Sequence, residues 1–321
     1  MHNIIYLAMD NIQIVKECAA SIFSLHYIIK NEIEKYRIVI YTNLTEEFKK
    51  YNLQELFPIE YIQISDALKR EWIHDTRYIY KIKIHVLLDF LQKRNQNLVF
   101  LDGDTFLLGD IGEMFNILSN HKHVAFMNYP EKNIKQLNEE RKNQSSGRLR
   151  FQEKIYEDLR CSSSLVVEGK SYKIEEDFSF WNSGVLGVTP RMKDCLEEAL
   201  VLNDYFLKHY KLLTSEQTAL SVALSQNYQI IPADHIIYHY WFLKETRYLV
   251  EAALNLPLEF EKKYLLSPVI QSLQQNKRVE YKTLEKQVAY FINKKDHIFL
   301  KGLYSTISPS SYLGQSLRNY V

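Results

Sequence analysis

The stretch LVFLDGDT, residues 98–105, decides the expected fold of this chain. Four consecutive apolar residues predict a short buried strand of the kind found in parallel sheets. Asp102 and Asp104 follow directly, with Gly103 between them. Two carboxylates one residue apart at a strand end can reach one hard cation, and the glycine lets backbone and phosphate approach closely. The stretch therefore predicts a divalent-cation site; the alternative is a polar strand end with turn-forming aspartates.

Upstream of this stretch, strand and helix patterns alternate. Residues 4–8 (IIYLA) and 37–41 (RIVIY) predict two more buried strands. Apolar residues at helical spacing predict a helix over residues 12–23 and another over residues 78–91. Strand, helix, strand, helix, strand predicts a parallel sheet covered by helices on both faces. Ligands bind such sheets at the carboxyl ends of the strands.

Downstream, the pattern is less regular. Residues 131–160 are polar, with 8 basic and 6 acidic side chains, and predict a surface insertion or lid over about 131–175, or a solvated helix pair. Strand signals resume at 178–188 and 230–240, with a helix between them.

The end of the chain has a different character. Residues 277–321 hold 8 basic and 3 acidic side chains in a helical pattern. They predict either a contact with an anionic membrane face or a solvated helical tail. We therefore expect a main domain over residues 1–250 and a helical, basic extension over residues 251–321.

Composition excludes several classes of protein. The 321 residues are 46% hydrophobic and 25% charged, which is typical of a globular protein. A formal net charge of +1 provides no field to attract nucleic acid. Three cysteines (Cys18, Cys161 and Cys195) without C-x-x-C spacing favour reduced thiols in a cytoplasmic protein. No stretch has the basic and apolar pattern of a leader, or a fully apolar run of membrane-spanning length.

The strand with the two aspartates also carries a family resemblance. Residues 98–111 (LVFLDGDTFLLGDI) resemble the metal-binding strand of nucleotide-sugar glycosyltransferases with the GT-A fold, most closely family 8, the glycogenin and galactosyltransferase group. That fold implies a mixed, mainly parallel, Rossmann-like sheet with flanking helices. Residues 4–11 (IIYLAMDN) and 21–25 (SIFSL) resemble the first strand and helix of this group. The resemblance implies that three residues lie near the nucleotide base and ribose: Ala8, Asp10 and Asn11.

A second motif is FWNSGVLGV, residues 180–188, which resembles a glycine-containing strand of the same family. The resemblance places Asn182 in the sugar or acceptor pocket, with Ser183 and Gly184 close by. A glycine inside an apolar strand also suggests close approach of a ligand or backbone. The alternative for Asn182 is a buried side chain that satisfies a backbone hydrogen bond.

A third motif is TSEQTA, residues 214–219, which is similar to the family's helix with an acidic residue followed by glutamine. The resemblance assigns Glu216 to a donor-sugar hydroxyl and Gln217 to the catalytic site, although the family more often has aspartate before the glutamine. Thr214 and Gln217 also fit a capping box, in which the glutamine would satisfy a helix amide.

The third metal ligand is expected from IIYHYWFLK, residues 236–244. By resemblance, His239 is the ligand and Lys244 contacts the diphosphate, although the glycine, proline and tryptophan of the family pattern are missing here. His235 competes with His239. An imidazole beside two carboxylates suits manganese or a related divalent ion.

Basic residues ahead of the aspartates supply further candidates. Arg77 and Lys81 are predicted one helical turn apart, where they could reach a donor phosphate or sugar, and Lys83 competes for the same role. A solvated helix face is the alternative.

Together these features predict a metal-dependent glycosyltransferase. The expected cofactor is Mn²⁺ or Mg²⁺, and the expected substrates are a nucleotide-sugar, by resemblance a UDP-sugar, and a glycan or other hydroxyl acceptor, with retention of configuration. The expected location is the cytoplasm or the inner membrane face. Two alternatives remain: a catalytically silent relative that binds nucleotide or glycan, and a phosphatase of the haloacid dehalogenase type, whose motif would need glycine after the second aspartate.

Overall fold

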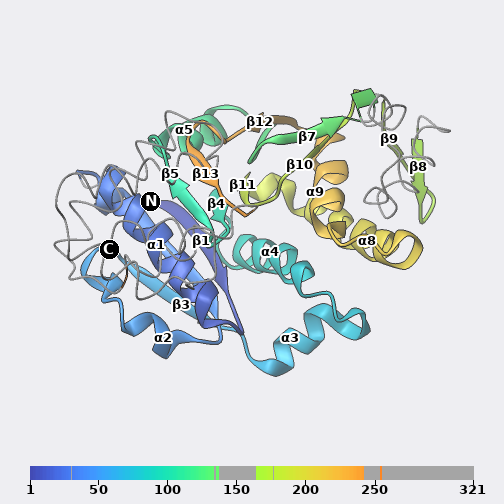
Figure 1. Cartoon of the computed structure of the whole chain (residues 1–321). Coiled ribbons are helices and arrows are strands. Elements are labelled where there is room, and N and C mark those ends of the chain that lie inside the picture. The colour runs from blue at the N-terminus through green and yellow to red at the C-terminus, as the bar shows by residue number, and fades with distance from the viewer. Residues whose placement is uncertain (30, 134, 137–163, 176, 242–253, 255–321) are drawn as a thin grey trace, which may run out of the picture.

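The structure, a computed structural model, describes residues 1–29, 31–133, 135–136, 164–175, 177–241 and 254. Figure 1 shows how helices and strands alternate through this part of the chain. The strands are β1 (His2–Ala8), β2 (Tyr36–Thr42), β3 (Ile59–Gln63), β4 (Leu98–Leu101), β5 (Thr105–Leu107), β6 (Val124–Met127), β7 (Pro130–Asn133), β8 (Ser164–Val167), β9 (Lys170–Lys173), β10 (Ser179–Trp181), β11 (Val185–Val188), β12 (Gln229–Pro232) and β13 (Ile237–His239). The α-helices are α1 (Ile12–Ile29), α2 (Thr45–Lys49), α3 (Asp66–Ile73), α4 (Ile82–Arg94), α5 (Gly112–Asn120), α8 (Lys193–Tyr210) and α9 (Ser215–Ser225). Short 3₁₀ helices span Ile33–Lys35, Leu53–Glu55, His74–Thr76, Ile79–Lys81 and Pro190–Met192.

A seven-stranded sheet forms the centre, in the order β12-β6-β11-β4-β1-β2-β3. Its neighbouring strands are parallel, except that β11 runs antiparallel to both β4 and β6. The first residues of β11 therefore lie at the same edge as the last residues of β1, β4 and β6. Two small antiparallel pairs, β5 with β13 and β7 with β10, extend from this edge.

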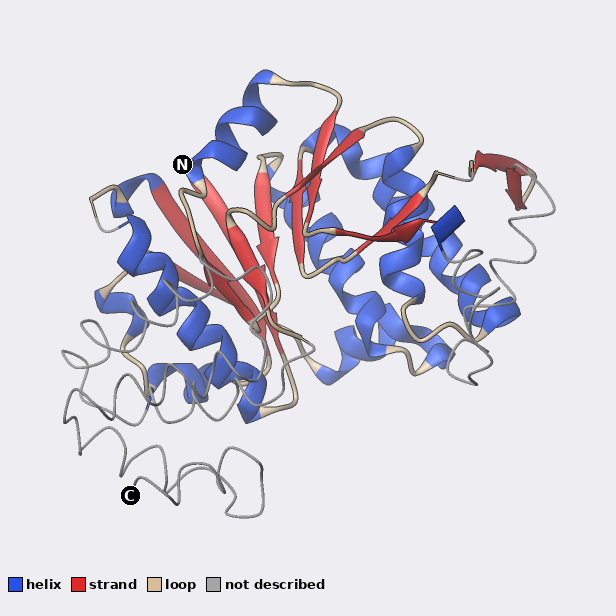
Figure 2. Cartoon of the chain, turned by 45° about the horizontal axis from the view of Figure 1, so that its top comes forward, coloured by secondary structure: helices blue, strands red, loops and turns tan. Residues whose placement is uncertain are grey.

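Helices cover both faces of the sheet, as Figure 2 shows. Side chains alternate between the faces along each strand, so Val99 and Leu101 of β4 pack with α1, α2 and α5. Leu98 and Phe100 pack with α3, α4, α8 and α9 on the other face. The predicted mixed, mainly parallel sheet with flanking helices is confirmed.

Helix α1 is apolar enough to pass a length and composition test for a membrane span, with a mean hydropathy of 1.2 over its 18 residues. Of that window, 61% is buried inside the protein. Val15, Ala19 and Ile22 belong to the core beside β1 and β4. The core of the main sheet therefore accounts for its apolar residues.

Several sequence predictions need correction or fall outside the described part. The helix predicted over residues 78–91 begins as an α-helix only at Ile82, after a 3₁₀ turn. Of the predicted insertion, the described residues form β7 and the antiparallel pair β8–β9. Most of the predicted extension, residues 251–321, lies outside the described residues, as does Cys161. Cys18 and Cys195 are buried free thiols.

Candidate metal and donor site

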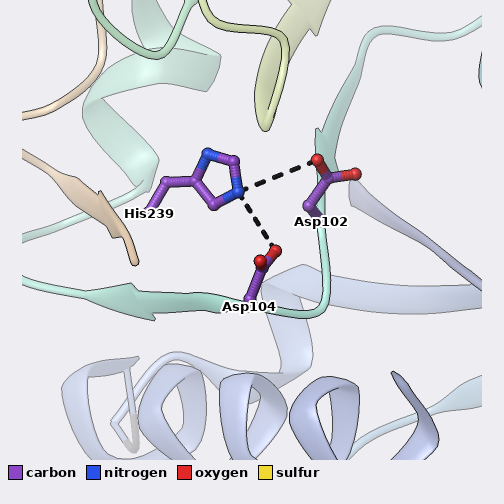
Figure 3. A group of neighbouring side chains, drawn as sticks. All are labelled: Asp102, Asp104 and His239. Atoms are coloured by element: carbon purple, nitrogen blue, oxygen red, sulfur yellow. Dashed lines mark hydrogen bonds and ion pairs between the residues drawn. The ribbon is translucent and has the colours of Figure 1, made fainter. Parts of the chain in front are cut away.

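Two strand ends bring the predicted metal ligands together. Asp102 and Asp104 leave β4, and His239 ends β13, which pairs with β5 so that His239 lies opposite Thr105. Figure 3 shows the imidazole facing both carboxylates. Its Nε2 lies 3.0 Å from Asp104 Oδ1 and 3.9 Å from Asp102 Oδ2. Ligand atoms of all three residues lie within 4.8 Å of one another.

The donor set fits a divalent cation. Two carboxylate oxygens and one imidazole nitrogen suit Mn²⁺ or a similar ion. The Asp102 and Asp104 side chains are partly exposed, at 29% and 17%, while His239 is 5% exposed. Burial alone would raise the pKa of the Asp104 carboxyl, but the hydrogen bond and the charge of His239 hold that pKa below its ordinary value.

The competing histidine is placed differently. His235 is exposed and lies outside the three-residue group, in the loop between β12 and β13. His239, and not His235, lies beside the aspartates because the chain is held there by the residue that follows β13. Tyr240 stacks on Phe106 with ring centroids 5.0 Å apart. The Tyr240 amide also donates to the Asp104 carbonyl oxygen at 3.1 Å.

Gly103 allows a close approach, as predicted, but to the backbone of α1. A Cβ atom at this position would lie 3.1 Å from the Cys18 nitrogen and 3.2 Å from the Ile14 carbonyl oxygen. The glycine therefore lets the aspartate turn pack against the helix that covers β4.

Lys83 is the basic residue that reaches the aspartates. It lies in the first turn of α4, and its Nζ is 3.1 Å from Asp102 Oδ2 and 3.2 Å from Glu216 Oε1. Burial alone would lower the pKa of Lys83, but these two carboxylates raise it well above its ordinary value. Burial raises the pKa of Glu216, which Lys83 opposes. The ammonium therefore remains charged and joins the two carboxylates.

The other two predicted basic residues lie elsewhere. Lys81 is buried, and its Nζ contacts Asp204 of α8 at 2.7 Å. Arg77 is exposed and has a left-handed backbone conformation with φ 55°. The prediction that both share one helix face is wrong, because the chain is not yet helical at Arg77. Lys244 lies outside the described residues.

The segment Asn182–Ser183–Gly184 enters β11 beside these groups. Ser183 Oγ donates to Glu216 Oε1 at 2.8 Å, and the Ser183 amide donates to Gln217 Oε1 at 3.3 Å. The capping box predicted at the start of α9 is wrong, because the Thr214 side chain makes no capping hydrogen bond. Gln217 instead holds the segment before β11.

Two residues that sequence reasoning missed lie beside this segment. Glu131 accepts a hydrogen bond from Gln217 Nε2 at 2.8 Å; burial raises the pKa of Glu131, which Gln217 opposes. Asn128 Nδ2 donates to Asn182 Oδ1 at 3.3 Å, while the buried Asn128 Oδ1 has no partner among the described residues. Asn128 follows the apolar run VAFM of β6, so the rule that identified Asp102 could have found it.

The predicted nucleotide-side residues cluster at the end of β1. Ala8 is buried, whereas Asp10 and Asn11 are exposed. Asp10 exchanges hydrogen bonds with Asn43 after β2, at 2.9 and 2.7 Å, and pairs with Lys69 of α3. Burial alone would raise the pKa of Asp10, but Lys69 and Asn43 bring it below its ordinary value. Asn11 Oδ1 accepts from the Gln13 amide at 2.8 Å and so supports the start of α1.

Comparison with known proteins finds matches among solved structures. No protein-family model matches the chain, and none of the curated proteins compared with it matches either. Among solved structures, 170 chains match. One is the apo crystal structure of mouse xyloside xylosyltransferase 1, with 14% sequence identity and a TM-score of 0.47. That alignment covers 73% of this chain and 85% of that chain.

Proposed function

We propose that this chain is a metal-dependent glycosyltransferase with the GT-A fold, related to family 8. It moves a hexose-type sugar from a nucleotide-sugar, by resemblance a UDP-sugar, to a hydroxyl of a glycan or other acceptor. The observation that carries the proposal is the meeting of Asp102, Asp104 and His239 at the carboxyl edge of the main sheet. The mixed sheet and the segment before β11 agree with it.

The position of the three side chains at the carboxyl edge of the sheet supports this proposal. Asp102, Asp104 and His239 would hold Mn²⁺ or Mg²⁺, which, when bound, neutralises the charge that develops on a departing diphosphate. Lys83 holds the Asp102 carboxylate from the side of α4. It also adds a buried positive charge beside the place where a phosphate would bind.

Residues around this group would position the sugar and the nucleotide. Glu216, Gln217 and Asn182 come from two elements that converge beside Lys83 and His239, and we assign them to the sugar pocket. The end of β1, with Ala8, Asp10 and Asn11, would receive the base and ribose. Retention of configuration and action in the cytoplasm are part of the proposal.

A thermal-shift screen provides the first experiment. UDP-, GDP- and CDP-sugars are added with and without Mn²⁺, because a ligand that binds the native state raises its melting temperature. A metal-dependent rise with one nucleotide class supports the proposal. The same samples are then assayed for donor hydrolysis, which a transferase catalyses slowly and a silent binding protein does not.

The decisive variant is Asp104→Ala. We expect it to abolish metal-dependent donor cleavage while its circular dichroism spectrum remains unchanged. Asp110→Ala is the matched control, since Asp110 is an exposed carboxylate six residues further along and outside the ligand group. Undiminished turnover in Asp104→Ala would contradict the proposal.

A further inference from the structure

Asn182, Ser183 and Gly184 form one short segment that touches most parts of the candidate site. The Gly184 carbonyl oxygen accepts from the Asp102 amide at 2.8 Å. Ser183 accepts from Lys83 Nζ through its carbonyl oxygen and its Oγ, at 3.1 and 3.2 Å. Consecutive residues therefore hold one aspartate and the lysine that pairs with it.

The first residue of the segment holds the imidazole. Asn182 is 5% exposed, and its Oδ1 lies 2.8 Å from His239 Nδ1. The Gly184 amide donates to the same Oδ1 at 2.9 Å. A backbone N–H can only donate, so this contact identifies the oxygen of the Asn182 amide.

The contact favours a proton on one of the two ring nitrogens. An amide oxygen only accepts hydrogen bonds, so the contact with Asn182 requires a proton on Nδ1. Nε2 is the atom that faces Asp102 and Asp104; without a cation the Asp104 carboxylate accepts from it, and with a cation held there Nε2 would offer its lone pair. The Nδ1-protonated form, which Asn182 favours, is the tautomer that a metal ligand requires.

The last residue of the segment provides the space for the ring. A Cβ atom at Gly184 would lie 2.1 Å from His239 Nδ1 and 2.2 Å from its Cε1. Gly184 does not have a left-handed backbone. The glycine is therefore required for the volume of the imidazole and not for an unusual backbone conformation.

We infer that Asn182 is a positioning residue, which fixes the Nδ1-protonated tautomer and the orientation of His239 for a divalent cation, in the space that Gly184 leaves. This role is distinct from contact with sugar, and it rests on the proposed metal site. Metal-binding histidines that lose such a partner lose about 10–100-fold in metal affinity.

The first experiment requires no metal. Nitrogen-15 spectra of the histidine rings are recorded at a pH where the ring is neutral, and His239→Gln identifies the His239 signals. Asp104 favours the proton on Nε2 and Asn182 favours it on Nδ1. We therefore expect a larger share of the Nδ1-protonated form in the unaltered chain than in Asn182→Ala, and its return in Asn182→Asp, which keeps the accepting oxygen. An unchanged tautomer in Asn182→Ala would overturn the inference.

The second experiment measures Mn²⁺ affinity by isothermal titration calorimetry without any sugar donor. We expect Asn182→Ala to bind about 10–100-fold more weakly and Asn182→Asp to recover most of that loss. Asn203→Ala is the control, because it also removes a buried asparagine, which in that case contacts Ser215. Equal losses in Asn182→Ala and Asn203→Ala would indicate a general structural effect and overturn the inference.

The two measurements distinguish a failure of the proposed metal site from a failure of the positioning role of Asn182. An unaltered chain that binds no Mn²⁺ would contradict the proposed metal site and, with it, the cation part of this inference. The tautomer result would still decide whether Asn182 positions His239.

Discussion

His239 shows at the scale of a single residue how an ordinary histidine becomes a candidate ligand. Three neighbours act on it: Asn182 on Nδ1, Asp104 on Nε2, and Gly184 against the ring face. None of these contacts is local in sequence. The imidazole is therefore positioned by the fold and not by its own strand alone.

The volume at Gly184 gives a prediction. Gly184→Ala would place a methyl group where the His239 ring lies, so the ring must leave its position or the strand must shift. Such overpacking costs about 1–3 kcal/mol, and we expect Mn²⁺ affinity, measured by calorimetry, to fall at least about tenfold. Gly109→Ala is the control, since its Cβ would be 3.8 Å from the nearest atom. Equal affinity in both variants would contradict the prediction.

Single site residues could be predicted from the sequence where the neighbouring residues show which element they belong to. Asp102 and Asp104 stand out because they end an apolar strand, and His239 stands out by resemblance; the structure brings these three together. Arg77, Lys81 and Lys83 cannot be ranked from the sequence, because the choice depends on where α4 begins. Helix α4 packs against α3 and α8, and these long-range contacts are not visible in the local sequence.

Helix α4 offers a matched comparison at the scale of one element. Lys83 is the second residue of α4, and Lys81 lies directly before the helix. Both lysines are buried and each forms an ion pair with a carboxylate. The partner of Lys81, Asp204, is 47% exposed and can be solvated, whereas Glu216, a partner of Lys83, is 6% exposed. The same substitution should therefore have unequal effects.

We expect Lys83→Met to lower the free energy of unfolding by about 3–5 kcal/mol, because it leaves the buried Glu216 carboxylate without its positively charged partner. Lys81→Met should change it by less than about 1 kcal/mol, since water screens the remaining charge. Urea unfolding followed by circular dichroism measures both. Similar losses in the two variants would show that the ion pairs do not differ in this way.

Elements are predictable where both faces of a strand are buried. β1, β2 and β4 are almost fully buried and have apolar runs, whereas β3, with the sequence IEYIQ, is partly exposed and has no clear strand pattern. The residues of β11 do not reveal that this strand runs against its neighbours. Strand direction follows from the path of the connections, and a four-residue apolar run has the same pattern in either direction.

The protonation of the His85 ring affects the stability of the whole molecule. It stacks on Trp72, with ring centroids 5.4 Å apart, and its buried Nε2 has no hydrogen-bond partner in the described part of the chain. Burial, with the nearby charge of Lys81, lowers the pKa of His85 to about 4. In the unfolded chain the pKa is near the ordinary value of about 6.5.

This difference predicts a pH dependence of stability. Between about pH 6.5 and 4 the unfolded chain binds a proton on His85 and the folded chain does not. The free energy of unfolding is therefore at its full value above pH 6.5 and decreases as the pH falls toward 4. We expect His85→Gln to flatten the unfolding free energy in this window, measured by urea unfolding. His121→Gln, at an exposed histidine, should leave the slope unchanged. An unaltered slope in His85→Gln would contradict the prediction.

The pairing of β13 with β5 has a consequence for the order in which the molecule is made. Asp104 and His239 are separated by 135 positions, so a nascent chain presents both carboxylates long before the imidazole has been synthesised. Closing the loop between these two residues costs conformational entropy before the contacts between β5 and β13 can form. The complete set of three ligands is therefore formed only when β13 has paired with β5, so cation affinity should report that this long-range pairing is in place.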